Sequence, residues 1–154
     1  MKRFLFSLLS VLALHTVWAH APVAQASTPL VTVTQAWVRG SVQGQSGTGA
    51  FMKITAREQL RLIAVSTPVA GQAQVHEMRM QGNVMSMREL EGGLELPAGQ
   101  AVTLAPGGLH VMLLDLKTAL PAGRTLPMTL VFQDAKGAQS KLQITVPVAM
   151  RAPH

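Results

Sequence analysis

Methionine and histidine side chains gather in one stretch of the sequence, from His76 to Met112. Five of the chain's nine methionines lie there together with two histidines, and these are Met78, Met80, Met85, Met87, Met112, His76 and His110. Thioethers are neutral, polarizable donors that favour Cu(I), and imidazole also suits copper, whereas Mg²⁺, Ca²⁺ and Mn²⁺ prefer oxygen ligands. Zinc would prefer cysteine, histidine or carboxylate ligands. The residue types in this stretch therefore point to a site for a soft metal ion.

The spacing of these residues predicts a hairpin that places the methionines on one face. Gly82-Asn83 is typical of a two-residue turn. Such a turn sets up two cross-strand pairs, in which Met78 faces Met87 and Met80 faces Met85. His76 then lies on the same face, diagonal to Met87, so that both side chains can reach one ion. The opposite face carries polar side chains, as expected for a surface in contact with water: Glu77, Arg79, Ser86 and Arg88.

A later apolar segment repeats the pattern with His110 and Met112. These residues stand two positions apart, so a strand there points both side chains to one face. Their neighbours Leu109, Val111 and Leu113 occupy the other face and are all apolar. Two histidines and one or more methionines can therefore meet on one ion if the fold brings this strand beside the hairpin. Because an imidazole must be deprotonated to bind a metal, we expect binding to weaken as the pH falls through about 6.5.

A second interpretation of the same residues needs no metal. Methionine fills irregular cores, and a methionine stripe on the inner face of a hairpin is often packing. A single histidine, such as His76 or His110, is often held by hydrogen bonds for structural reasons. The chain would then be an exported β-sandwich module for binding or adhesion. A Cu(I) titration separates the two interpretations.

The sequence offers little support for enzyme chemistry. No Ser-His-Asp set, phosphate-binding loop or paired-carboxylate site is visible, and there is no cysteine to act as a nucleophile. Cleavage of a leader after Ala19 would make His20 the N-terminal residue, and an N-terminal histidine can chelate copper for oxygen chemistry. No second histidine is positioned to help it, and a later cleavage point fits better. We therefore expect a protein that is not an enzyme.

The first residues predict an export signal. Lys2 and Arg3 supply a positive start, residues 4–14 form an apolar run too short to span a bilayer, and Ala24-Gln25-Ala26 fits a cleavage site. We expect a signal peptide over residues 1–26, one copper-binding domain over 27–147 and a loose C-terminal tail over 148–154. The mature protein would then be periplasmic, with no stable insertion in the membrane. Without cysteine there is no disulfide, so the core must hold the fold.

The charge of the chain indicates a solvated surface rather than a nucleic-acid partner. Lysine and arginine number 13 against seven acidic residues, for a formal net charge of +6. The basic residues are scattered, without a run and with almost no aromatic residues between them. We therefore expect no binding to nucleic acid.

Short alternating or apolar runs separated by Gly, Pro, Gln and Ser predict an all-β sandwich or barrel of a single domain. Long helical patterns are missing from the sequence. The expected strands are Val31–Val38, Gly49–Thr55, Leu60–Ser66, Gln74–Met80, Val84–Leu90, Ala101–Leu104, Leu109–Leu116, Pro127–Phe132 and Lys141–Val146.

Several segments resemble the periplasmic copper chaperones called PCu(A)C. The matching segments are Ala36-Trp37-Val38-Arg39, Gly49-Ala50-Phe51-Met52, Val75-His76-Glu77-Met78, Met85-Ser86-Met87-Arg88 and Pro106-Gly107-Gly108-Leu109-His110-Val111-Met112. The most specific part is a histidine, ten residues, a methionine, 22 residues and then His-x-Met.

This resemblance implies a fold, a site and a role. The fold would be a cupredoxin-like, Greek-key β-sandwich. The site would be accessible from the surface and would bind one Cu(I) per monomer through His76, Met87, His110 and Met112. The ion would pass to a copper-accepting protein, such as the CuA subunit of cytochrome c oxidase or another copper chaperone. Family members also serve general copper tolerance.

Overall fold

A computed structural model describes residues 29–153 of the chain, so the expected signal peptide and His20 lie outside the described residues. The described part consists of ten β-strands and contains no helix, and therefore none that could span a membrane. The strands are β1 (Val31–Arg39), β2 (Gly47–Ala56), β3 (Leu60–Ser66), β4 (Ala70–Gln81), β5 (Val84–Glu89), β6 (Leu94–Leu96), β7 (Ala101–Leu104), β8 (His110–Leu116), β9 (Thr125–Asp134) and β10 (Gln139–Ala149).

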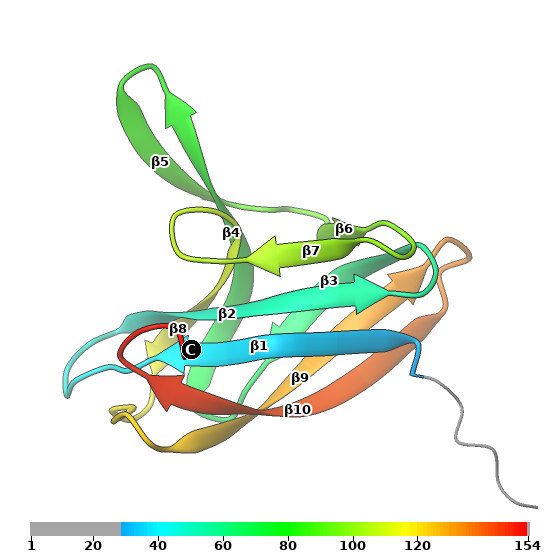
Figure 1. Cartoon of the computed structure of the whole chain (residues 1–154). Coiled ribbons are helices and arrows are strands. Elements are labelled where there is room, and N and C mark those ends of the chain that lie inside the picture. The colour runs from blue at the N-terminus through cyan, green and yellow to red at the C-terminus, as the bar shows by residue number, and fades with distance from the viewer. Residues whose placement is uncertain (1–28, 154) are drawn as a thin grey trace, which may run out of the picture.

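The strands follow one hydrogen-bonded path, in the order β5-β4-β8-β2-β1-β10-β9-β3-β6, with β7 beside β2. Strands β1 and β10 run parallel where Val38 pairs with Val148, and every other strand pair is antiparallel. The path folds over itself, so that β1 and β2 lie across from β3, β9 and β10 (Figure 1). The expected all-β, cupredoxin-like sandwich is confirmed.

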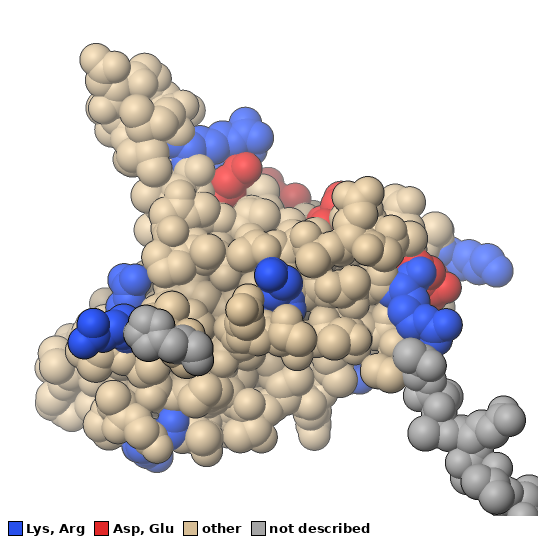
Figure 2. All heavy atoms as spheres, in the orientation of Figure 1, with Lys and Arg blue, Asp and Glu red and all other residues tan. Residues whose placement is uncertain are grey.

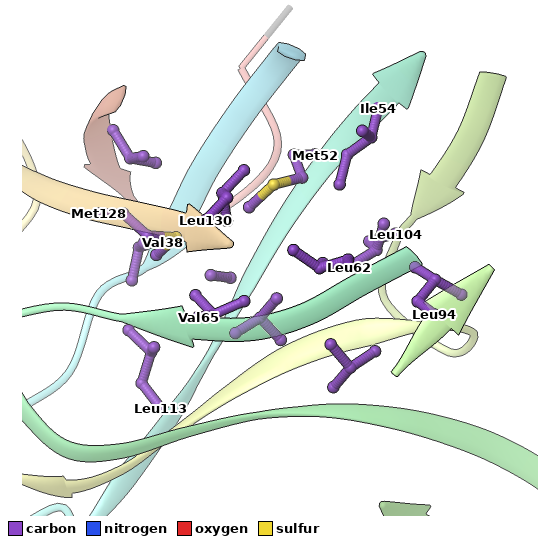
Figure 3. Packing of buried hydrophobic residues seen from close by; sticks show 14 of the residues in the cluster. Val38, Met52, Ile54, Leu62, Val65, Leu94, Leu104, Leu113, Met128 and Leu130 are labelled. Atoms are coloured by element: carbon purple, nitrogen blue, oxygen red, sulfur yellow. The ribbon is translucent and has the colours of Figure 1, made fainter. Parts of the chain in front are cut away.

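The core lies between these two layers and is built by the alternation of the strands. Each strand sends every second side chain inward, and the inward positions are apolar (Figure 3). Val38, Leu62, Val111 and Leu113 have no exposed surface. Because β8 buries Val111 and Leu113, its other face is left for His110 and Met112.

Nine of the ten strands were expected, with ends that differ from the structure by up to four residues. The largest difference is at β4, which begins at Ala70 rather than at Gln74. Strand β6, which was not expected, is only three residues long; it pairs with β3 and buries Leu94 and Leu96. The last strand was expected to end at Val146, but β10 continues to Ala149. Val148 is only 3% exposed and pairs with Val38 of β1. The first two residues of the segment expected to be a tail, Val148 and Ala149, therefore belong to the sheet.

Strands β4 and β5 form a projecting hairpin, here called the arm. The first part of β4 pairs with β8 inside the body, from Ala70 to His76. Beyond His76, β4 continues with β5 as its partner, and Figure 1 shows the two strands extending away from the sandwich. The arm therefore joins the body at the level of His76.

Candidate metal centre

The predicted hairpin register is confirmed along the arm. Met78 pairs with Met87 and Met80 pairs with Met85, on either side of the two-residue turn. Gly82 has φ +61°, which suits the first central position of a type II′ turn and would strain a residue with a side chain. The local turn chemistry thus sets the face on which the four methionines lie.

The body contributes the two histidines from neighbouring strands. His76 on β4 pairs directly with His110 on β8, so both side chains lie on the same face of the sheet. Their ring centroids are 5.8 Å apart, and the rings meet edge to face at 65°. The sequence predicted that the histidines could meet only if the strand of His110 lay beside the hairpin, and β8 does lie beside β4.

Hydrogen bonds set the tautomer that each imidazole has in its neutral form. His110 Nδ1 donates to the carbonyl oxygen of Gly108 at 3.0 Å, which leaves the lone pair of the neutral ring on Nε2. His76 Nε2 lies 3.0 Å from the amide oxygen of Gln74 and donates to it, which leaves the lone pair on Nδ1. Metal-binding histidines commonly fix their second nitrogen in this way.

The Nδ1 atom of His76 is buried and has no hydrogen-bond partner among the described residues. A buried acceptor without a partner is costly, so such atoms call for an explanation. Burial lowers the pKa of His76, the neighbouring His110 lowers it further, and Glu89 partly offsets the change. His76 is therefore held as a neutral ring with a free lone pair, the form that binds a metal ion.

Two glycines of β2 leave room for large side chains on this face. Met112 lies opposite Gly49. A Cβ atom on Gly47 would lie 3.1 Å from Met112 Cε, and one on Gly49 would lie 2.7 Å from Phe51 Cζ. Both distances are shorter than ordinary contacts, so the glycines allow Met112 and Phe51 to lie over β2.

Three of the four expected ligands line one open hollow of about 320 Å³. Met87, His110 and Met112 contribute to its wall, together with Met78, Phe51 and Arg39. His76 does not line the hollow but contacts the His110 ring beside it. Histidine, cysteine and carboxylate side chains form no group of three suited to a metal within residues 29–153.

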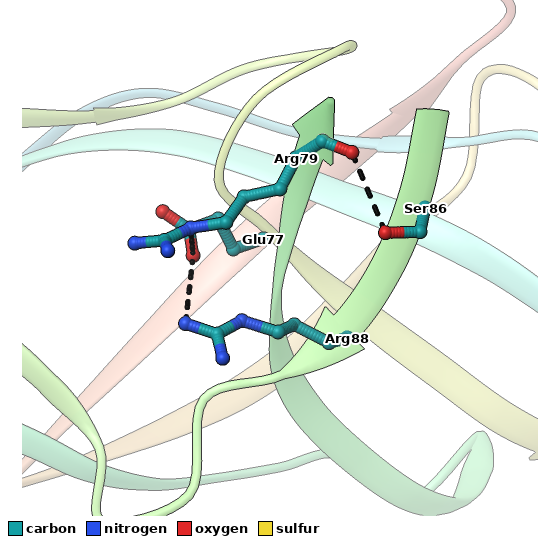
Figure 4. Close-up of polar contacts among 4 residues, drawn as sticks. All are labelled: Glu77, Arg79, Ser86 and Arg88. Atoms are coloured by element: carbon teal, nitrogen blue, oxygen red, sulfur yellow. Dashed lines mark hydrogen bonds and ion pairs between the residues drawn. The ribbon is translucent and has the colours of Figure 1, made fainter. Parts of the chain in front are cut away.

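The opposite face of the arm is polar, as expected. Glu77 Oε2 forms ion pairs with Arg79 Nε at 2.7 Å and with Arg88 Nη2 at 3.5 Å. The Ser86 hydroxyl donates a hydrogen bond to the Arg79 carbonyl oxygen (Figure 4). These contacts are largely exposed and link the two strands without a core. The arm thus has a charged face and a thioether face.

The sequence-based site did not include the residues that form the wall and orient the histidines. The rings of Trp37 and Phe51 stack with centroids 4.6 Å apart, and Arg39 Cζ lies 5.5 Å from the Phe51 ring centre. Gln74 and Gly108 hold the histidines. The alternation of Gly47, Gly49 and Phe51 on one face was a usable signal for this wall.

The fold and the site define a class of protein, a small β-sandwich domain with histidine and methionine donors on one outer sheet face. Solved structures share the fold. The apo PCuAC domain from PmoF1 is 28% identical, with a TM-score of 0.58, and covers 79% of this chain and 96% of its own. The copper-bound PCuAC domain from PmoF2 is 26% identical, with a TM-score of 0.58 and coverage of 80% and 97%. CuI-DR1885 from Deinococcus radiodurans is 27% identical, with a TM-score of 0.57 and coverage of 81% and 82%.

The chain belongs to the family described as "Putative lipoprotein LpqE-like", whose model matches residues 31–148. A relative, "Putative lipoprotein Lxx21020" from Leifsonia xyli subsp. xyli, is 33% identical over 118 residues, which are 77% of this chain and 69% of the relative. The sequence of this chain contains no cysteine.

Proposed function

We propose that this protein is an exported carrier that binds one Cu(I) through His76, Met87, His110 and Met112 and passes it to a copper-accepting protein. The observation that carries the proposal is the meeting of these donors on one sheet face. Met87, His110 and Met112 line a single hollow, and the His76 ring lies 5.8 Å from the His110 ring.

The free lone pair on the buried Nδ1 atom of His76 supports a metal rather than a packing role. A structural histidine would be expected to use both nitrogens in hydrogen bonds, and Nδ1 of His76 has no such partner among residues 29–153. The exposure of Met87, at 49%, also argues against a core role for the methionine face. The copper-bound PCuAC domain from PmoF2 and CuI-DR1885 have the same fold and support copper as the metal.

The donor set suits a carrier. All four donors are neutral, and two are thioethers, so they favour Cu(I) over hard divalent ions. An ion held by neutral donors beside an open hollow can be reached by the ligands of another protein. Because no cysteine takes part, the site cannot be lost to disulfide formation in an oxidising compartment such as the periplasm.

An anaerobic Cu(I) titration in competition with a chromogenic chelator tests the proposal. We expect one tightly held ion per monomer, and a loss of affinity of about tenfold or more in Met87→Ala and in His110→Ala. Met150→Ala is the matched control, because Met150 is 67% exposed and lies outside the hollow. Unchanged binding in both ligand variants would contradict the proposed site, and no Cu(I) binding by the wild-type protein would favour the non-metal binding module.

The recipient and the location need separate tests. We propose the CuA subunit of cytochrome c oxidase, or another copper chaperone, as the acceptor. Mixing the Cu(I)-loaded protein with the apo CuA domain and following the CuA absorption measures transfer directly. Fractionation of cells that express the full chain tests whether the mature protein is periplasmic.

A further inference from the structure

The tip of the arm carries methionines that core packing does not explain. Met80 is 61% exposed and Met85 is 49% exposed. In contrast, Met52 and Met128 fill the core and are 2% and 1% exposed. An exposed thioether gains little from burial, so the two methionines at the tip call for another reason.

The register places the sulfur-bearing chains close together. In a hairpin with a two-residue turn, Gln81 and Val84 form the hydrogen-bonded pair next to the turn. Met80 and Met85 are therefore a non-hydrogen-bonded pair, in which the Cα atoms approach to about 4.5 Å and the side chains are close. Each methionine has three rotatable side-chain bonds, so both sulfur atoms can turn toward one ion.

The surroundings of this pair select the kind of ion. Neither carboxylate of the arm lies at its tip. Glu77 is on the opposite face and is paired with Arg79 and Arg88, and Glu89 pairs with His76 at the base of the arm, four cross-strand pairs away from Met80 and Met85. The visible side of the arm's tip shows no charged atoms (Figure 2). Two neutral sulfur donors with no carboxylate favour a soft monovalent cation and disfavour hard divalent ones. With few donors and open access to water, such a site must be weak and fast to exchange.

We propose that Met80 and Met85 form a second, weaker site for Cu(I) or Ag(I) at the tip of the arm, distinct from the hollow. Met78 and Met87 form the next thioether pair between the tip and His76. An ion bound at the tip can therefore reach the hollow by exchanging one thioether for the next, without a change of oxidation state. This role as a loading point rests on the proposed function of the hollow, whereas binding at the tip does not.

Methionine methyl NMR with Ag(I) as the probe tests the second site on the exported protein, with methyl-labelled methionine. We expect the first equivalent to shift the Met87 and Met112 signals, and further equivalents to shift Met80 and Met85 in fast exchange. Met150, which is 67% exposed and lies outside the arm, serves as the internal control. The double variant Met80→Leu/Met85→Leu should lose the second event, with at least a tenfold weaker second affinity, and should keep the first.

The outcomes separate the two proposals. If Met80 and Met85 respond only at the Ag(I) concentrations that shift Met150, or respond together with Met87 at the first equivalent, the second site is overturned. If the first event is missing while Met80 and Met85 respond before Met150, the second site stands and the proposed function fails. For the loading role, the double variant should take up Cu(I) from a chelator complex several-fold more slowly at unchanged affinity of the hollow, and an unchanged rate would overturn it.

Discussion

Strand β8 offers a sharp test of the idea that one strand serves the core with one face and the site with the other. Leu113 points into the core and has no exposed surface, whereas its neighbour Met112 is partly exposed and lines the hollow. Leu113→Ala removes buried groups and leaves a cavity, at a cost of about 3 to 5 kcal/mol. For a domain of this size we expect the melting temperature to fall by roughly 11 to 19 °C. Met112→Leu keeps the volume and removes the sulfur, so it should cost less than about 1.5 kcal/mol.

Leu113→Ala should therefore lower stability without changing Cu(I) affinity, and Met112→Leu should lower Cu(I) affinity with little change in stability. Thermal unfolding followed by circular dichroism measures stability, and competition with a Cu(I) chelator at a temperature where both variants are folded measures Cu(I) affinity. Leu113→Ala should bind Cu(I) with wild-type affinity, and Met112→Leu should bind at least about tenfold more weakly. The reasoning is refuted if Leu113→Ala weakens binding as much as Met112→Leu does, or if Met112→Leu unfolds as early as Leu113→Ala.

Two further predictions concern pH and close packing. The pKa of His76 in the folded, metal-free protein is lowered by burial and by His110, so the unfolded chain takes up this proton first. The free energy of unfolding should thus decrease as the pH falls below about 6.5. Urea unfolding at several pH values measures this decrease, which should be smaller in His76→Gln than in the wild-type protein. An equal decrease in both proteins would contradict this prediction. Gly49→Ala places a Cβ 2.7 Å from Phe51 Cζ and should cost about 1 to 3 kcal/mol, whereas Gly108→Ala meets no atom closer than 3.8 Å. Chemical denaturation of the two variants should separate them, and equal stabilities would show that the Phe51 ring moves aside freely.

The features predicted most accurately from the sequence were those that depend on residues near one another in the chain. The pairing of Met78 with Met87 follows from a two-residue turn and strand alternation, and both signals lie within a few residues of Gly82. The arrangement of β4 beside β8 could be stated only as a condition. His76 and His110 are separated by strands β5, β6 and β7 and the turns that connect them, and no local pattern determines which strands pair across such a distance.

The elements that the sequence did not predict have equally physical causes. Strand β6 is too short to show an alternating pattern, and it is defined by its burial against β3. The extension of β10 depends on a parallel contact between Val148 and Val38, which are at opposite ends of the described chain. The lone pair left on His76 depends on the placement of one amide, that of Gln74, and such a contact cannot be read from spacing.

The proposed site combines donors of two kinds, and this combination suits the binding and release of an ion. His110 and Met112 are held by β8, whose inner face is locked in the core by Val111 and Leu113. Met87 comes from the arm, which is joined across its polar face by exposed ion pairs that contribute little to stability. A movement of the arm would therefore leave the donors on the body in place. Withdrawal of Met87 would open one coordination position without disturbing the fold, and an acceptor protein could enter there.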